Sequence, residues 1–69
     1  MKISARNIIK GKVKEIVPGS VNSEIIIETA LGETIVSIIT RDSVENLGLE
    51  VGKEVYAVVK ASNVMVAVD

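Results

Sequence analysis

Cysteine and histidine are both absent from this 69-residue sequence, and Tyr56 is its only aromatic residue. Without cysteine the chain can form neither disulfides nor thiolate metal sites, and without histidine it has no imidazole ligand. No pair of carboxylates stands at a recognisable catalytic spacing. We therefore expect that the protein is not an enzyme.

Long apolar runs and a strong net charge are also missing. No run approaches the length of a membrane span, and residues 1–20 lack the apolar core of a signal peptide. Eight basic and nine acidic residues give a net charge of −1, which argues against a general nucleic-acid or anionic-membrane surface. We therefore expect a cytoplasmic protein with neither a nucleic-acid partner nor a membrane partner.

Aliphatic residues, mostly Val and Ile, dominate what is present. Hydrophobic residues make up 48% of the chain, and β-branched residues favour strands. A chain of this length forms one domain, here residues 1–69, and buries only about 60% of the surface that its unfolded form exposes. The aliphatic surface is more than one small fold easily covers, so we expect self-association.

The hydrophobic pattern and the turn signals predict five strands, at residues 8–17, 21–29, 34–39, 54–60 and 64–68. Gly11 interrupts the first strand, which indicates a bulge or a close backbone approach. Gly32 suits a positive φ in a hairpin turn between the second and third strands. Residues 43–47 have the pattern of a short helix that ends at Gly48. The strand at 64–68 is apolar on both faces, so both faces need cover.

Five strands with one short helix between the third and fourth predict an all-β fold, a five-stranded OB-type Greek-key barrel. An SH3-like barrel is the competing architecture, although the inserted helix favours the OB type. On the first strand, Lys10, Lys12 and Lys14 alternate and share one face. A solvated outer face explains them best, and a small OB-type nucleic-acid-binding protein is the alternative function. That alternative lacks the aromatic stacking platforms that single-strand binding normally requires.

Two short segments near the chain ends are rich in hydrogen-bond donors and contain no general base: residues 4–7 and residues 60–63. Arg6 offers a planar fork of N–H groups, and Lys60 offers a compact positive charge. Small residues beside them allow a ligand to approach main-chain N–H groups, and nearby hydroxyls add further donors. The candidate oxyanion-binding residues are Ser4, Ala5, Arg6, Thr40, Ser43, Lys60, Ala61 and Ser62.

A site built only from donors selects among anions, because it offers no acceptor to a protonated ligand. Hydrogen phosphate is therefore disfavoured, whereas molybdate, tungstate and sulfate are fully ionised at neutral pH and remain open. The anion keeps its four oxygens, so no side chain coordinates the metal directly. Structural roles compete with this hypothesis: Thr40 and Ser43 suit helix capping, and Arg6 and Lys60 suit ion pairs with acidic residues.

The order and spacing of several short strings resemble the molbindin, or Mop, family over nearly the whole chain. The strings are Ser4-Ala5-Arg6-Asn7, Gly11, Gly19-Ser20-Val21-Asn22, Ile39-Thr40, Leu47-Gly48-Leu49, Gly52 and Val59-Lys60-Ala61-Ser62. The resemblance implies a cytoplasmic OB-fold protein that binds molybdate or tungstate, with no organic cofactor, and assembles as a homohexamer, a trimer of dimers.

The resemblance also implies where the anions bind. One class of site lies between subunits and joins the Ser-Ala-Arg segment of one chain to the Thr…Ser and Lys-Ala segments of another, here Ser4 to Arg6 with Thr40, Ser43, Lys60 and Ala61. A second class lies near the threefold axis at Gly19, Ser20, Val21 and Asn22. Family members that act as regulators or transporters carry further domains, so storage or homeostasis is the role expected for this chain.

Overall fold

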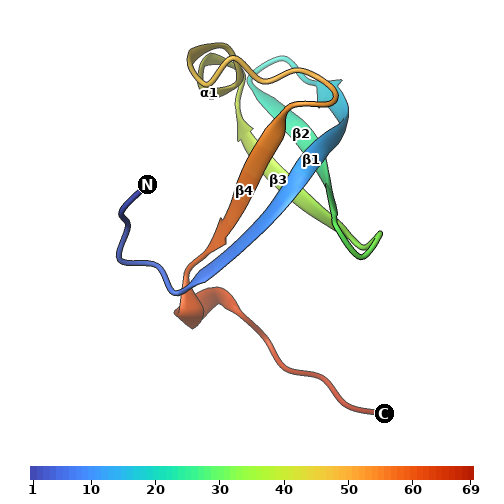
Figure 1. Ribbon diagram of the computed structural model, residues 1–69. Helices are drawn as coiled ribbons and strands as arrows, with labels where there is room; N and C mark the ends of the chain where they lie inside the picture. Colours follow the sequence, from blue (N-terminus) through green and yellow to red (C-terminus); the bar gives the residue numbers. More distant parts are fainter.

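The computed structural model describes residues 1–69 and contains four β-strands and one α-helix (Figure 1). The elements are β1 (Asn7–Pro18), β2 (Asn22–Thr29), β3 (Thr34–Thr40), α1 (Arg41–Asn46) and β4 (Glu54–Val59), followed by a 3-10 turn, η1 (Ala61–Asn63). The first four predicted strands and the helix between the third and fourth are confirmed. The helix begins at Arg41, earlier than predicted, because the side chain of Thr40 caps it.

The strands form one curled antiparallel sheet in the order β3-β2-β1-β4. The long β1 pairs with β4 through its first half, starting at Asn7 opposite Val59. Its second half pairs with β2 and ends at Pro18 opposite Ser23. The two ends of β1 therefore lie at opposite ends of the sheet, and each end organises a different group of candidate residues.

Gly11 lies where β1 is paired on both sides, opposite Thr29 of β2 and Val55 of β4. A Cβ atom at this position would come within 2.6 Å of the Glu28 carbonyl oxygen. The predicted close approach is thus confirmed at Gly11, whereas the break in the β1–β2 register lies between Val13 and Glu15. Gly32 has φ +85, as its hairpin turn requires.

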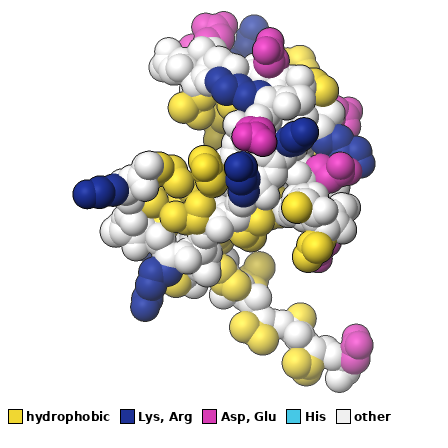
Figure 2. Space-filling model, viewed as in Figure 1, with side chains coloured by type: hydrophobic (Ala, Val, Ile, Leu, Met, Phe, Trp, Pro, Cys, Tyr) yellow, Lys and Arg dark blue, Asp and Glu magenta, His cyan; other side chains and the backbone are white.

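The core is small and lies on the concave face of the sheet. Its buried hydrophobic residues are Val13, Ile25, Ile27 and Ala57. Only six of the 69 residues are buried, which agrees with the expectation that one small fold does not cover the aliphatic surface of this chain. Many large aliphatic side chains are left on the surface, where they gather along the strands and on the C-terminal segment (Figure 2).

The prediction of a fifth strand over residues 64–68 is wrong for the isolated chain. These residues are exposed, form no strand and extend away from the sheet (Figure 1). The edges of β3 and β4 do not pair with each other, so the sheet curls without closing and the five-stranded barrel is not confirmed. The physical reason is that no strand of the same chain lies against residues 64–68. The structure also contains no helix long and apolar enough to cross a membrane.

Candidate functional site

The pairing of Asn7 with Val59 brings the two donor-rich segments together, because each directly adjoins one of these paired residues. They line a common depression of about 440 Å³. Its lining residues are Ile3, Ser4, Ala5, Arg6, Lys60, Ala61 and Ser62. Six of the predicted site residues therefore meet in one place. Ile3 was not among the predicted residues, and its position next to Ser4 is the only signal in the sequence that points to it.

The polar side chains of this depression have no partners within the chain. None of the side-chain hydrogen bonds or ion pairs involves Arg6, Lys60 or Ser62. Within the isolated chain, Arg6 and Lys60 therefore form no ion pair. The lining contains no carboxylate, so two permanent positive charges and two hydroxyl groups border a space without a negative charge.

The depression is open to water in the isolated chain. All of its lining residues are exposed except Ala5, which is half-buried. An anion is strongly hydrated, so a protein competes for it best with several fixed donors in a site shielded from solvent. A single chain supplies hydrogen-bond donors but leaves the depression open to solvent.

Thr40 and Ser43 lie elsewhere, at the junction of β3 and α1. Thr40 is opposite Asn22, beyond the far end of β1, which is a strand of twelve residues and so roughly 35 Å long. The Thr40 hydroxyl accepts a hydrogen bond from the Ser43 N–H at 3.1 Å and donates one to Ser43 Oγ at 2.9 Å. The interpretation of Thr40 as the helix cap is therefore confirmed. Within one chain, Thr40 and Ser43 do not join the other six residues.

The second predicted group, residues 19–22, comprises the turn between β1 and β2 and the first residue of β2, Asn22. The Gly19 N–H donates to the Asn22 carbonyl oxygen at 2.9 Å, which closes the turn. Ser20 and Val21 line a second depression, of about 410 Å³, together with Thr40. Its remaining lining residues are Arg41, Asp42 and Glu45. Two carboxylates face one guanidinium there, so this depression lacks the purely donor character of the first.

The lysines on the outer face of β1 have acidic neighbours. Lys10 Nζ lies 3.7 Å from a Glu54 carboxylate oxygen, and Lys14 Nζ lies 3.4 Å from one of Glu28. All four side chains are largely exposed, which fits the interpretation of a solvated outer face. No group of three or more metal-ligating side chains occurs in the structure.

The chain is similar to proteins of one kind over its whole length. Residues 3–66 match the family model of the TOBE domain. The chain is 51% identical over 69 residues to a probable molybdenum-pterin-binding protein of Haemophilus influenzae, and the match covers all of both proteins.

Two solved structures agree closely with this one. MopII from Clostridium pasteurianum is 49% identical with a TM-score of 0.93, over 97% of this chain and 100% of that one. A molybdate-binding protein from Sporomusa ovata is 45% identical with a TM-score of 0.91, over 97% of this chain and 98% of that one. The chain therefore belongs to the TOBE-domain family, within the group of Mop molybdenum-pterin-binding proteins that its sequence motifs resemble.

Proposed function

We propose that this protein binds molybdate or tungstate without catalysing a reaction, and that it stores or buffers the anion in the cytoplasm. The observation that carries the proposal is the depression between residues 4–6 and 60–62, where Arg6 and Lys60 face no carboxylate and have no ion-pair partner. Both relatives whose names state a ligand are binding proteins, for molybdenum-pterin and for molybdate. Absence of cysteine is compatible with the cytoplasm.

The donor chemistry supports a fully ionised tetrahedral anion. Arg6 gives two parallel N–H donors, Lys60 gives a point charge, and the hydroxyls of Ser4 and Ser62 complete the set. Molybdate and tungstate have only acceptor oxygens at neutral pH, so every contact is favourable. Hydrogen phosphate would place its own O–H against donors, which leaves that proton without an acceptor.

We infer that the binding site is completed at an interface between copies of the chain. The depression is exposed in one chain, and Thr40 and Ser43 cannot reach it from the far end of β1. Because Thr40 donates its proton to Ser43, the Ser43 hydroxyl proton is free to reach an anion held by a neighbouring copy. The homohexamer, as a trimer of dimers, is the assembly that we propose. Residues 19–22 remain the predicted second site in that assembly.

The same assembly accounts for the missing strand. The edges of β3 and β4 each lack a partner, and residues 64–68 are extended and apolar without a sheet to join. We propose that these residues form the fifth strand of an OB-type barrel only when copies associate. The alternative function, nucleic-acid binding through the β1 lysines, gains no support because Lys10 and Lys14 have acidic neighbours.

Isothermal titration calorimetry of the intact oligomer tests the proposal. A charge-assisted hydrogen bond contributes about 1.5–3 kcal/mol, so Arg6→Ala should weaken molybdate binding roughly 10- to 150-fold. Lys12→Ala is the matched control: it removes one positive charge from the exposed face of β1 and should leave the affinity unchanged. Unchanged affinity in Arg6→Ala, or equal loss in both variants, would contradict the assignment.

A further inference from the structure

The depression between residues 4–6 and 60–62, which we name the anion depression, is larger than one inorganic oxyanion needs. It measures about 440 Å³, within the range of about 300–1,000 Å³ that is typical of pockets for organic ligands. A tetrahedral oxyanion consists of one central atom and its oxygens, so it fills only part of this space. In one chain the depression is also open, because all of its lining residues except Ala5 are exposed. It therefore has room for a group attached to the anion.

The lining of the anion depression combines charged and apolar side chains. Arg6 and Lys60 supply the positive charges, whereas Ile3, Ala5 and Ala61 supply the apolar surface. Ile3 is 51% exposed, and its side chain offers no hydrogen bond to an inorganic anion. Hydrocarbon beside a cluster of cationic donors suits a ligand whose anionic head carries a carbon-containing group.

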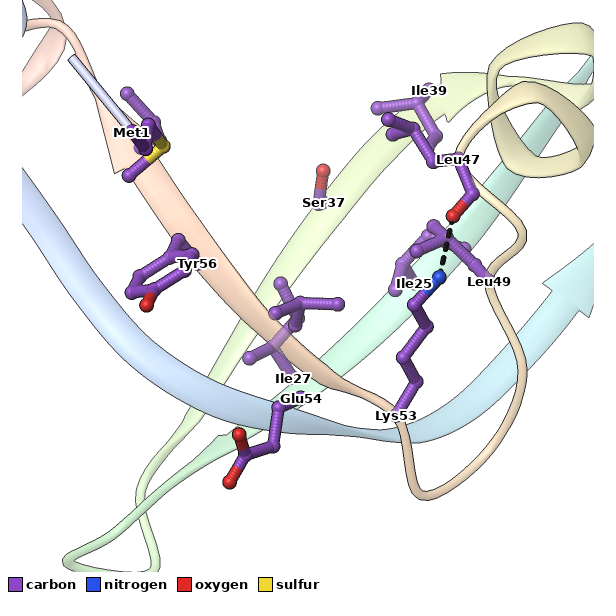
Figure 3. A pocket seen from close by; sticks show the side chains of 12 residues that line it. Met1, Ile25, Ile27, Ser37, Ile39, Leu47, Leu49, Lys53, Glu54 and Tyr56 are labelled. Carbon is purple, nitrogen blue, oxygen red and sulfur yellow. Dashed lines mark hydrogen bonds between the residues drawn. The ribbon is translucent and has the colours of Figure 1, made fainter. Parts of the chain in front are cut away.

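The apolar groove on the concave side of the sheet lacks this combination. Its volume is about 340 Å³, and nine of its twelve lining residues are hydrophobic. Its one cationic side chain, Lys53, donates to the Leu47 carbonyl oxygen at 2.7 Å (Figure 3). Its carboxylate, that of Glu54, lies 3.7 Å from Lys10 Nζ. The groove therefore offers an anion no free cationic side chain, and an organic anion is better accommodated by the anion depression.

The absence of a carboxylate from the anion depression determines which organic anions fit it. A phosphate monoester loses its second proton at about pH 6, and it then presents three acceptor oxygens and no O–H group. Arg6 can bond two of these oxygens through its planar fork, and Lys60 can bond the third. Hydrogen phosphate carries nearly the same charge at about pH 8 but keeps a proton, for which the lining has no carboxylate acceptor. An ester has carbon in place of that proton, so the mismatch is removed.

We propose that the anion depression also binds small organic phosphate monoesters in their dianionic form, with the phosphoryl group on Arg6 and Lys60 and the ester group against Ile3. The inference rests on the proposed function, because it uses the same anion site and adds a second class of ligand. Molybdate and a phosphate monoester then compete for one site, so the protein holds less molybdate where such esters are abundant. Sulfate monoesters carry a single negative charge and bind more weakly.

Isothermal titration calorimetry of the intact oligomer at about pH 8 tests the class of ligand. Methyl phosphate and inorganic phosphate have nearly the same charge there and differ in the proton, whereas methyl sulfate differs in charge. Because a proton without an acceptor is costly, methyl phosphate should bind about tenfold more tightly than inorganic phosphate, and also more tightly than methyl sulfate. Prior saturation with molybdate should abolish methyl phosphate binding, and Arg6→Ala or Lys60→Gln should weaken it about tenfold or more.

The outcomes of these titrations separate the inference from the proposed function. Binding of molybdate without binding of methyl phosphate overturns the inference and leaves the proposed function intact, since it means that the assembled copies leave no room for an ester group. Equal affinities for methyl phosphate and inorganic phosphate overturn it as well, because the missing acceptor would then not select the ligand. Methyl phosphate binding that persists under saturating molybdate places the ester elsewhere and also overturns it. Absence of molybdate binding overturns the proposed function itself.

Substitution of Ile3 tests where the ester group lies. Phenyl phosphate has a larger apolar group than methyl phosphate, so contact with Ile3 should favour it about threefold or more. Ile3→Ala should remove most of that preference. Ile38→Ala is the control, because Ile38 is 70% exposed on β3 and does not line the depression. Equal preferences for phenyl phosphate in the two variants would show that the ester group does not lie against Ile3, and would overturn that part of the inference.

Discussion

The two ends of the sheet use the same kinds of side chain in opposite ways. At the helix end, formed by residues 40–53, Thr40 caps α1, and Lys53 Nζ donates to the carbonyl oxygens of Leu47 at 2.7 Å and Gly48 at 3.1 Å. At the terminal end, formed by residues 1–6 and 60–69, no side chain makes a hydrogen bond. All four side-chain hydrogen bonds of the structure thus belong to the helix end.

This difference separates donors that stabilise the fold from donors that remain available. Lys53 neutralises the carbonyl end of a helix, which is a structural task completed within the chain. Lys60 carries the same group and has no such task. The donors of the terminal end are exposed to water in the isolated chain and have no partner within it. Substitutions in the core, at the helix end and at the terminal end should therefore have different effects on stability, and the core substitution should have the largest.

Removal of core volume should have the largest effect. Ile25 is 2% exposed and packs at the centre of the concave face, so Ile25→Ala leaves a cavity and should cost about 2–5 kcal/mol of unfolding free energy. Urea denaturation at fixed protein and molybdate concentrations measures this loss. Leu31→Ala, at an exposed hairpin position, is the control and should change the midpoint little. A loss no greater than that of the control would mean that the core contributes little to stability.

A methyl group at Gly11 should have the next largest effect. Its Cβ would lie 2.6 Å from the Glu28 carbonyl oxygen and 2.8 Å from Ile27 Cγ2, and the ladders on both sides of β1 prevent an easy shift. Gly11→Ala should therefore cost about 1–3 kcal/mol. Lys12→Ala, one residue along the same strand, controls for a change of side chain alone. Equal midpoints for the two variants in urea would show that β1 accommodates the methyl group.

Loss of the helix cap should have a moderate effect confined to the helix end. Thr40→Ala removes the acceptor of the Ser43 N–H and should cost about 1 kcal/mol, whereas Thr40→Ser keeps the hydroxyl and most of the stability. Ser62→Ala, at the terminal end, removes a hydroxyl that bonds to nothing within the chain and should change the unliganded melting temperature very little. Similar losses for Thr40→Ala and Ser62→Ala would erase the distinction between the two ends.

The sequence predicted most of the fold because its signals are local. Turn residues and alternation located β1 to β4, and the antiparallel pairing of β1 with β4 then brought residues 4–6 beside residues 60–62. Closure of the barrel was not predictable from local signals. The apolar pattern of residues 64–68 indicates that both faces of this segment must be buried, but it does not indicate whether the same chain or another chain buries them.

Two parts of the predicted site could not be assigned from residue types alone. A hydroxyl near a helix start serves equally well as a cap or as an anion donor, and only the hydrogen bonds of Thr40 show which task it performs within the chain. Likewise, residues 19–22 offer main-chain donors, but the sequence does not show that Asp42 and Glu45 share their depression. In both cases the deciding neighbour comes from another element of the fold.

Substitution of Lys60 should have the smallest effect on the unliganded protein and should become visible only when the anion is present. Its side chain has no partner in the chain, so Lys60→Gln should change the unliganded stability by less than about 0.5 kcal/mol. Molybdate at 100 times its dissociation constant should stabilise the parent protein by about 2.7 kcal/mol, and a tenfold weaker site would lose roughly half of that gain. Thermal melts with and without molybdate, with Lys12→Gln as the control, measure both quantities. If Lys60→Gln destabilised the unliganded protein as much as the liganded one, Lys60 would be a structural residue, and the distinction between the two ends of the sheet would not hold.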